Sequence, residues 1–136
     1  MNQIYALLFL VFLSGSDNVY QRGKASYYAQ SMNGHRTSSG ERYCSDSLTA
    51  AHARLPFGTR VEVRNLKNDS VVVLRIIDRM SASSSRIIDV SWAAAKKLNF
   101  VRDGLAQVEL KLIDTLPRKW ANFLFKTSKL LTFLRY

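Results

Sequence analysis

The chain has 136 residues, of which 47% are hydrophobic and 22% are charged, so it is long enough for one folded core and too short for two. Its formal net charge of +10 is high for this size and favours an anionic partner, for which bacterial envelopes, nucleic acids and anionic lipids all qualify. Two prolines, six glycines and no repeat argue against a long disordered stretch in the middle of the chain.

The first sixteen residues have the pattern of an export signal. The run from Ile4 to Leu13 is almost wholly apolar, and it is shorter than the roughly 20 residues that a membrane-spanning helix needs. Small residues at 14–16 suit cleavage before Asp17, although no lysine or arginine precedes the apolar run. We therefore expect a signal peptide at 1–16 and a short linker at 17–22, with an uncleaved anchor or a buried first helix as the alternative.

The middle of the chain alternates between apolar and polar residues, as β-strands do. The pattern predicts strands at 23–28, 59–64, 70–77, 87–90 and 105–113, with a loop at 29–40 and a hairpin turn at 66–69. Residues 71–74 are apolar on both faces, which indicates a strand covered on both sides. Ser91 is placed to cap a helix at 92–98, and Asn99 to end it. The sum is a mainly β domain with one short helix, and the periodicity alone allows several small barrels.

Cys44 is the single cysteine of the chain. One thiol excludes an intramolecular disulfide, and with only two histidines beside it a structural zinc site is not expected. Free cysteine behaves as a small hydrophobic residue, so we expect Cys44 to be buried, with an intermolecular bond as the alternative. No metal and no cofactor is expected.

Several ordered motifs resemble the RlpA-like (rare lipoprotein A) family. They lie at residues 23–28, 37–43, 48–52, 55–61, 76–79 and 86–95. The resemblance implies a six-stranded double-psi β-barrel with one or two short helices at 23–114, and it implies lytic transglycosylase activity on the glycan strands of peptidoglycan. Many family members are lipoproteins with a cysteine after the signal, whereas this chain has Ser16 and Asp17 there. We therefore expect an exported protein of the periplasm or envelope, or a secreted one, that is not a lipoprotein.

Asp78 is the first candidate for chemistry. It shares strand parity with Val72, Leu74 and Ile76, so its carboxyl group is expected at the rim of an apolar barrel. Partial burial there raises a carboxyl pKa and favours proton donation, although the neighbouring Arg79 opposes the shift. From the residues alone, an Asp-Arg pair that fixes a turn is the alternative. The resemblance places Asp78 on the catalytic aspartate of the family.

The resemblance matches Glu41 and His52 to the other polar positions of the family's groove. Glu41 is expected to hold sugar hydroxyls or to support developing charge, and His52 to bind glycan or to orient Asp78. A solvated turn glutamate and a half-buried core histidine are the alternatives. The remaining candidates are expected on the substrate side, mainly as residues that organise the loop backbone: Thr37, Ser39, Thr49 and Arg79.

Two positions depart from the family pattern. Cys44 stands where relatives commonly have aspartate, and Met80-Ser81 replaces a usual Gly-Pro after Asp78-Arg79. A missing glycine can reshape the rim beside the catalytic carboxyl group. One carboxyl group suffices for a lytic transglycosylase, because the C6 hydroxyl of muramic acid attacks C1 in place of water. The alternative to an enzyme is a glycan-binding barrel that does not cut.

Residues 115–136 have the pattern of a basic amphipathic helix, with no acidic residue after Asp114. This pattern favours an anionic membrane surface or an acidic partner, with packing on the barrel as the alternative. Peptidoglycan strands are the expected main partner. No nucleic-acid partner is expected, because the basic residues are dispersed and no reader motif is present.

Overall fold

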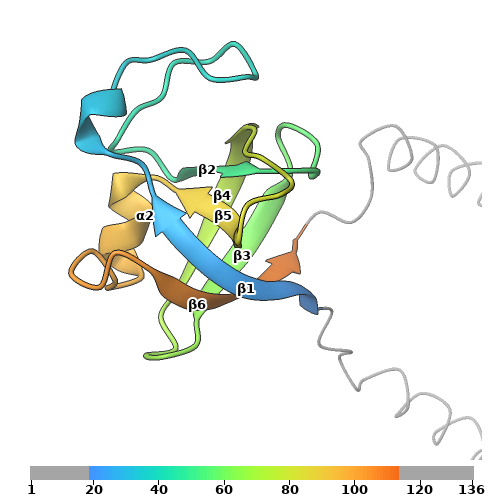
Figure 1. The fold of residues 1–136 in the computed structure, drawn as a ribbon, viewed down its shortest axis with the longest axis vertical. Coiled ribbons are helices and arrows are strands. Elements are labelled where there is room, and N and C mark those ends of the chain that lie inside the picture. The colour runs from blue at the N-terminus through green and yellow to red at the C-terminus, as the bar shows by residue number, and fades with distance from the viewer. Residues whose placement is uncertain (1–18, 114–136) are drawn as a thin grey trace, which may run out of the picture.

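The computed structural model of the protein describes residues 19–113, which form a closed β-barrel of six strands (Figure 1). The strands are β1 (Val19–Tyr27), β2 (Thr49–His52), β3 (Arg60–Asn65), β4 (Val71–Asp78), β5 (Arg86–Val90) and β6 (Ala106–Leu112). Around the barrel their order is β1, β5, β2, β4, β3, β6. The pairs β1/β5 and β2/β4 are parallel, and the other neighbours are antiparallel. The expected mainly β fold with six strands is confirmed.

Inward-facing aliphatic residues fill the barrel. Val61 and Val63 of β3 are fully buried, as the alternation predicted, and they meet the inner residues of β4 and β6. The expectation that β4 is covered on both sides is wrong, because Val71 is 47% exposed and Arg75 is exposed as well. β4 lies between β2 and β3 in the wall of the barrel, so its second face lies on the outer surface.

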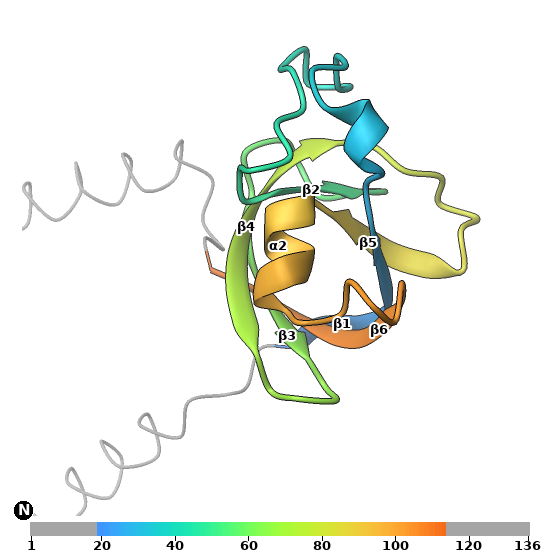
Figure 2. The ribbon, with the colours of Figure 1, turned by 90° about the vertical axis from the view of Figure 1, so that its left-hand side faces the viewer.

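A short helix, α2 (Trp92–Lys97), lies across one end of the barrel (Figure 2). The Ser91 hydroxyl caps it by accepting a hydrogen bond from the Ala94 N–H at 3.3 Å, as predicted. The helix ends at Lys97, and Asn99 follows the C-cap Leu98 with a φ of 54°, in the left-handed region that asparagine tolerates. Ala94, Ala95 and Leu98 belong to the buried core, so α2 is part of the barrel's packing. A 3-10 turn, η1 (Gln30–Met32), follows β1.

The structure differs from the prediction most clearly at β1 and at β2. β1 begins at Val19, so four residues of the expected linker belong to the first strand. β2 was not predicted from periodicity, because all four of its residues are buried and none gives a polar alternation. The signal peptide expected at 1–16 and the helix expected at 115–136 lie outside the described residues. Within 19–113, no helix has the length and apolar character needed to cross a membrane.

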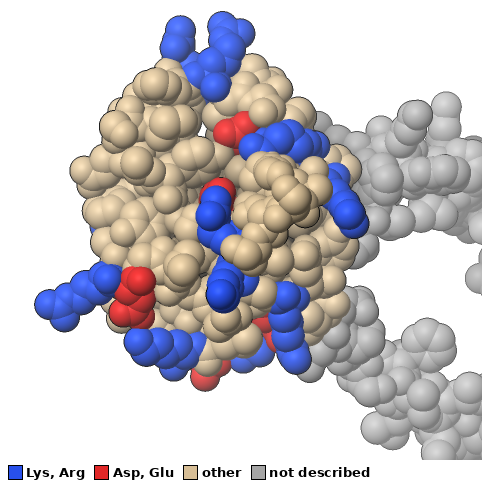
Figure 3. Space-filling view, in the orientation of Figure 1, with Lys and Arg blue, Asp and Glu red and all other residues tan. Residues whose placement is uncertain are grey.

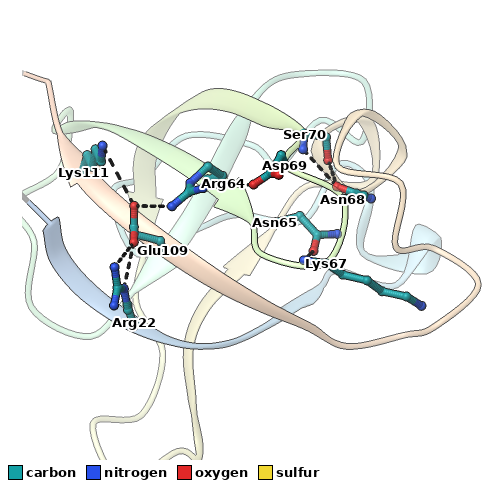
Figure 4. A network of polar contacts seen from close by, with 9 residues as sticks. All are labelled: Arg22, Arg64, Asn65, Lys67, Asn68, Asp69, Ser70, Glu109 and Lys111. Carbon is teal, nitrogen blue, oxygen red and sulfur yellow. Dashed lines mark hydrogen bonds and ion pairs between the residues drawn. The ribbon is translucent and has the colours of Figure 1, made fainter. Parts of the chain in front are cut away.

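An ion cluster on the outer surface links β1, β6 and β3 (Figure 4). Glu109 of β6 lies opposite Arg22 of β1 and Arg64 of β3. Its oxygens accept from both guanidinium groups, at 2.6 and 3.1 Å, and these side chains cover it so that only 1% of it is exposed. The hydrogen bond from Arg22, together with that from Arg64, lowers the pKa of Glu109. The cluster therefore gives two arginines of this basic chain a structural partner.

We predict that Leu74→Ala lowers the free energy of unfolding by about 2–5 kcal/mol, because the side chain is 1% exposed and its loss leaves a cavity in the core. Leu66→Ala is the matched control, since Leu66 is 40% exposed in the β3–β4 turn, and it is expected to change stability by less than about 0.5 kcal/mol. Urea denaturation of the two variants measures the difference. Equal effects would contradict the described core.

Candidate functional site

The loop between β1 and β2 extends beyond one end of the barrel (Figure 1) and folds back onto the end of β4. The Thr37 hydroxyl donates to the Glu41 carbonyl at 2.9 Å and also contacts the Ser39 hydroxyl at 3.0 Å. The Ser39 N–H donates to the Ile77 carbonyl at 3.2 Å, which joins the loop to β4 one residue before Asp78. Thr37 and Ser39 thus organise the loop backbone.

Three donors surround the carboxylate of Asp78. The Tyr28 hydroxyl donates to Oδ2 at 2.7 Å, and the N–H groups of Ser38 and Arg79 each donate to Oδ1 at 2.8 Å. Tyr28 follows β1, Ser38 comes from the loop, and Asp78 ends β4. The site is therefore assembled from three segments that are far apart in the sequence.

The protonation state expected for Asp78 is corrected by these contacts. Burial is the largest single influence and raises the pKa, but the hydrogen bonds from Tyr28, Ser38 and Arg79 together outweigh it and leave the pKa below its usual value. Burial and the bond to Asp78 raise the pKa of Tyr28, so its hydroxyl stays protonated and remains a donor. Asp78 is therefore ionised near neutral pH in the substrate-free protein.

Arg79 uses its side chain elsewhere. Its guanidinium donates to the carbonyls of Leu55 and His52 at 2.7 and 3.3 Å, and it lies over the Phe57 ring at 3.9 Å from the centroid. These contacts hold the turn between β2 and β3. Only the backbone N–H of Arg79 reaches the Asp78 carboxylate, so an Asp-Arg ion pair does not account for this position.

Glu41 lies in the same loop and binds β4. Both of its oxygens accept from the Arg75 guanidinium, at 2.6 and 2.8 Å, and this hydrogen bonding lowers the pKa of Glu41. The two side chains are about half exposed, at 45% and 47%. Glu41 is thus an ionised and accessible carboxylate at the end of the barrel that also holds Asp78.

The His52 ring has hydrogen-bond partners other than Asp78. Its Nδ1 accepts from the N–H groups of Arg54 and Leu55, so the ring proton is on Nε2, which donates to Gln21 at 3.2 Å. Burial lowers the pKa of His52, and the charges of Arg79 and Arg54 lower it further, so the ring is neutral. The expected orienting bond from His52 to Asp78 is not formed.

Thr49 is buried at 5% exposure, and its Oγ1 has no hydrogen-bond partner among the described residues. In this conformation its hydroxyl is out of reach of a substrate.

Sequence reasoning missed a second carboxylate on the same face. The strand register places Ser26, Asp89, Ala51 and Asp78 side by side on β1, β5, β2 and β4. Asp89 Oδ1 accepts from the Ser26 hydroxyl at 2.6 Å and from Arg86 Nε at 2.8 Å. The sequence pattern of Ile88, Asp89 and Val90 could have predicted this position. The two apolar neighbours face the core, so the side chain of Asp89 faces the outer surface. The small Ala51 separates the two carboxylates.

The two departures from the family pattern have different outcomes. Among the described non-glycine residues, positive φ is confined to Asp69 and Asn99, so Met80 has an ordinary backbone conformation and adds no strain there. The expectation that Cys44 is buried is wrong, because it is exposed. A hydrogen bond from the Ser47 side chain, followed by N–H groups of Asp46 and Ser47, lowers the pKa of its thiol. Within 19–113, no three His, Cys, Asp or Glu side chains are grouped to hold a metal.

The fold and this site define a double-psi barrel with a carboxylate held at the end of β4. A family model described as lytic transglycolase matches residues 20–110, and the chain belongs to this family. The resemblance to the RlpA-like family is thereby confirmed.

The curated relatives are RlpA proteins. The endolytic peptidoglycan transglycosylase RlpA of Neisseria meningitidis is 47% identical over 93 residues, which cover 68% of this chain and 39% of the relative. A probable RlpA of Aquifex aeolicus is 45% identical over 69% of this chain and 42% of its own length. The Pseudomonas aeruginosa protein is 43% identical over 72% of this chain and 28% of its own length. The match thus spans less than half of each relative.

Two solved structures share the fold at low identity. The Streptomyces papain inhibitor aligns with a TM-score of 0.55 and 22% identity over 71% of this chain and 97% of that chain. An expansin of Clavibacter michiganensis aligns with a TM-score of 0.56 and 16% identity over 71% of this chain and 51% of that chain. These likenesses support the barrel and nothing beyond it.

We predict that Tyr28→Phe raises the pKa of Asp78, because it removes a donor to the ionised form and leaves the burial in place. Tyr27→Phe is the matched control, since the Tyr27 hydroxyl donates to the Val101 carbonyl and not to Asp78. Carbon NMR titration of the Asp78 carboxyl group measures the shift. The charged and titratable groups around the pair are Tyr43, Asp89 and Arg79, and they are unchanged in both variants. An unmoved pKa in Tyr28→Phe would show that the hydroxyl does not control Asp78.

We predict that the native, folded protein reacts with one equivalent of a thiol reagent at Cys44, because this thiol is exposed and hydrogen-bonded in its ionised form. Spectrophotometric titration with a disulfide reagent checks this, and Cys44→Ser is the blank. A thiol that reacts only after denaturation would contradict the described turn.

Proposed function

We propose that this barrel is the catalytic domain of an endolytic peptidoglycan lytic transglycosylase that cleaves between MurNAc and GlcNAc, with Asp78 as general acid/base. The observation that carries the proposal is the half-buried carboxylate of Asp78, held by three donors at the end of β4. The family description and the printed names of the RlpA relatives support the reaction class. Peptidoglycan glycan strands are the proposed substrate.

The ionised state of Asp78 sets the order of proton movements. The carboxylate takes the proton of the muramic acid C6 hydroxyl as O6 bonds to C1, and the same proton is passed to the glycosidic oxygen as its bond to C1 breaks. The products are a 1,6-anhydromuramic end and a free C4 hydroxyl on the GlcNAc, so no water is consumed and no proton is left over. Tyr28 and the N–H groups of Ser38 and Arg79 keep the carboxylate charged and fixed in direction until the sugar arrives.

Glu41 is the second acidic residue that we expect to contact the sugar. Glu41 is exposed at the same end of the barrel and can accept bonds from sugar hydroxyls beside its contact with Arg75. Asp89 lies two strands from Asp78 on the same face, and its contacts with Ser26 and Arg86 hold it there as a fixed polar neighbour of the sugar. His52 acts in this proposal as a neutral residue of the binding surface.

The cellular setting follows from the substrate. A protein that acts on peptidoglycan works in the envelope or periplasm, which agrees with an export signal at 1–16. The basic segment at 115–136 would add affinity for an anionic membrane surface.

We predict that the full chain releases fragments with anhydromuramic ends from purified glycan strands and that Asp78→Asn abolishes their release, because the substituted amide cannot accept the C6 proton. Mass spectrometry of the products measures this. Asp103→Asn is the matched control, since Asp103 is an exposed aspartate paired with Lys67 between α2 and β6, and it is expected to retain activity. Binding of strands by the native chain without product would favour the glycan-binding module instead. Unchanged release by Asp78→Asn would contradict the assignment of the catalytic residue.

A further inference from the structure

A pocket lies on the barrel next to the Asp78 site, and the proposed proton transfers do not involve it. Its volume is about 320 Å³, and its lining comes from the first residues of β1, the end of β2 and the turn after it, the segment between β4 and β5, and the first residues of β5. Two contacts tie it to the site. Arg79 donates to the carbonyl of His52, which lines the pocket, and Arg86 of the pocket wall binds Asp89.

We propose that this pocket binds the carboxylate-bearing group of a muramic acid residue next to the cleaved bond, with Arg54 as its charged anchor. This assignment rests on the proposed function, because the muramic acid carboxylate belongs to the proposed peptidoglycan substrate. It concerns binding, however, and can be tested without turnover.

The charge of the lining selects an anion. The pocket is lined by two arginines and by no aspartate or glutamate. Arg86 is neutralised by Asp89, which accepts from its Nε and Nη2 at 2.8 and 3.3 Å. The Arg54 guanidinium is exposed and has no hydrogen-bond or ion-pair partner among the described residues. The lining therefore offers one uncompensated guanidinium, whose planar fork suits a carboxylate.

The neutral groups of the lining suit a sugar. His52 is neutral, and its Nε2–H donates to Gln21. This hydrogen bond fixes the orientation of both polar side chains in the pocket lining. Tyr20 is 44% exposed, and its ring centroid lies 6.0 Å from that of His52, which leaves an apolar face for a sugar ring. Ligand pockets usually have volumes of roughly 300–1,000 Å³, so about 320 Å³ fits one sugar residue with its substituent and excludes a long strand segment.

A departure from the family pattern contributes to the wall. Ser81 and Ser84 both line the pocket, and Ser81 stands where a proline is usual. The Ser84 hydroxyl accepts from the Arg86 N–H at 3.1 Å, which leaves its own proton to donate. The Ser81 hydroxyl contacts the Ser83 hydroxyl at 2.8 Å, so the Ser84 hydroxyl is the donor that this segment adds to the pocket lined by Arg54.

Binding of two monosaccharides to the full chain tests the proposal. N-acetylmuramic acid carries a free lactyl carboxylate, and N-acetylglucosamine has the same ring without it. We expect N-acetylmuramic acid to bind with a Kd lower by roughly tenfold, as expected for one hydrogen-bonded charge pair, measured by NMR titration. Arg54→Gln is expected to remove this preference and Arg54→Lys to keep part of it. Arg102→Gln, which changes an exposed arginine between α2 and β6, is expected to leave it unchanged.

A third probe identifies the source of the carboxylate. In muramyl dipeptide the lactyl group is amidated and the free carboxyl group lies on the peptide, so binding like that of N-acetylmuramic acid shows that the pocket accepts a free carboxylate at either position. Binding like that of N-acetylglucosamine assigns it to the lactyl group.

Asp78→Asn separates this proposal from the proposed function, because it is expected to stop cleavage and to keep the preference. Equal affinity for the two monosaccharides, or a preference that survives in Arg54→Gln, would overturn the pocket assignment even if the native chain cuts glycan.

Discussion

The convergence of three donors on one carboxylate is the constraint on which the site depends. The Tyr28 hydroxyl that reaches Asp78 is itself held by ring stacking on Tyr43, with centroids 4.6 Å apart. The Tyr43 hydroxyl accepts from the N–H of Trp92, the first residue of α2. The helix that closes the barrel therefore positions, through two aromatic rings, the group that fixes the charge of Asp78. The packing of α2 on the barrel therefore also determines the hydrogen bonding of the Asp78 carboxylate.

The loop between β1 and β2 has the complementary role. Its backbone donates to Asp78 through Ser38 and to the end of β4 through Ser39, and its Glu41 binds Arg75 farther along that strand. A loop held at three points costs little further ordering when a ligand arrives, so binding energy remains for positioning the sugar. The same contacts explain why small polar residues dominate this loop.

Much of the barrel could be predicted from the sequence because strand alternation and helix capping depend on residues that are close together in the chain. The alternation of Val61 and Val63 and the Ser91 cap depend on near neighbours, and both are present in the structure. β2 could not be predicted from periodicity, since four buried residues give no polar alternation. Strand parity placed Asp78 at the barrel end, but its pKa was predicted in the wrong direction. The decisive donors, Tyr28 and Ser38, lie 50 and 40 residues away and become neighbours only in the folded barrel.

The structure shows how the high positive charge of the chain is used, because several of the arginines are paired with acidic side chains. Arginines paired with Glu109, Glu41 and Asp89 serve the barrel itself, and basic side chains are scattered over the face in Figure 3 with acidic ones beside several of them. On this face of the described residues, the distribution does not form a continuous basic stripe. It leaves individual groups such as Arg54 for local recognition of an anion.

A crystal structure of the Asp78→Asn full chain with a glycan oligosaccharide tests the central claim most directly. The account predicts that a glycosidic oxygen lies within hydrogen-bond distance of the side chain at position 78, between Tyr28 and Ser38, with Glu41 facing the same sugar. A glycan bound on another face, with position 78 still closed off by its three donors, would contradict it.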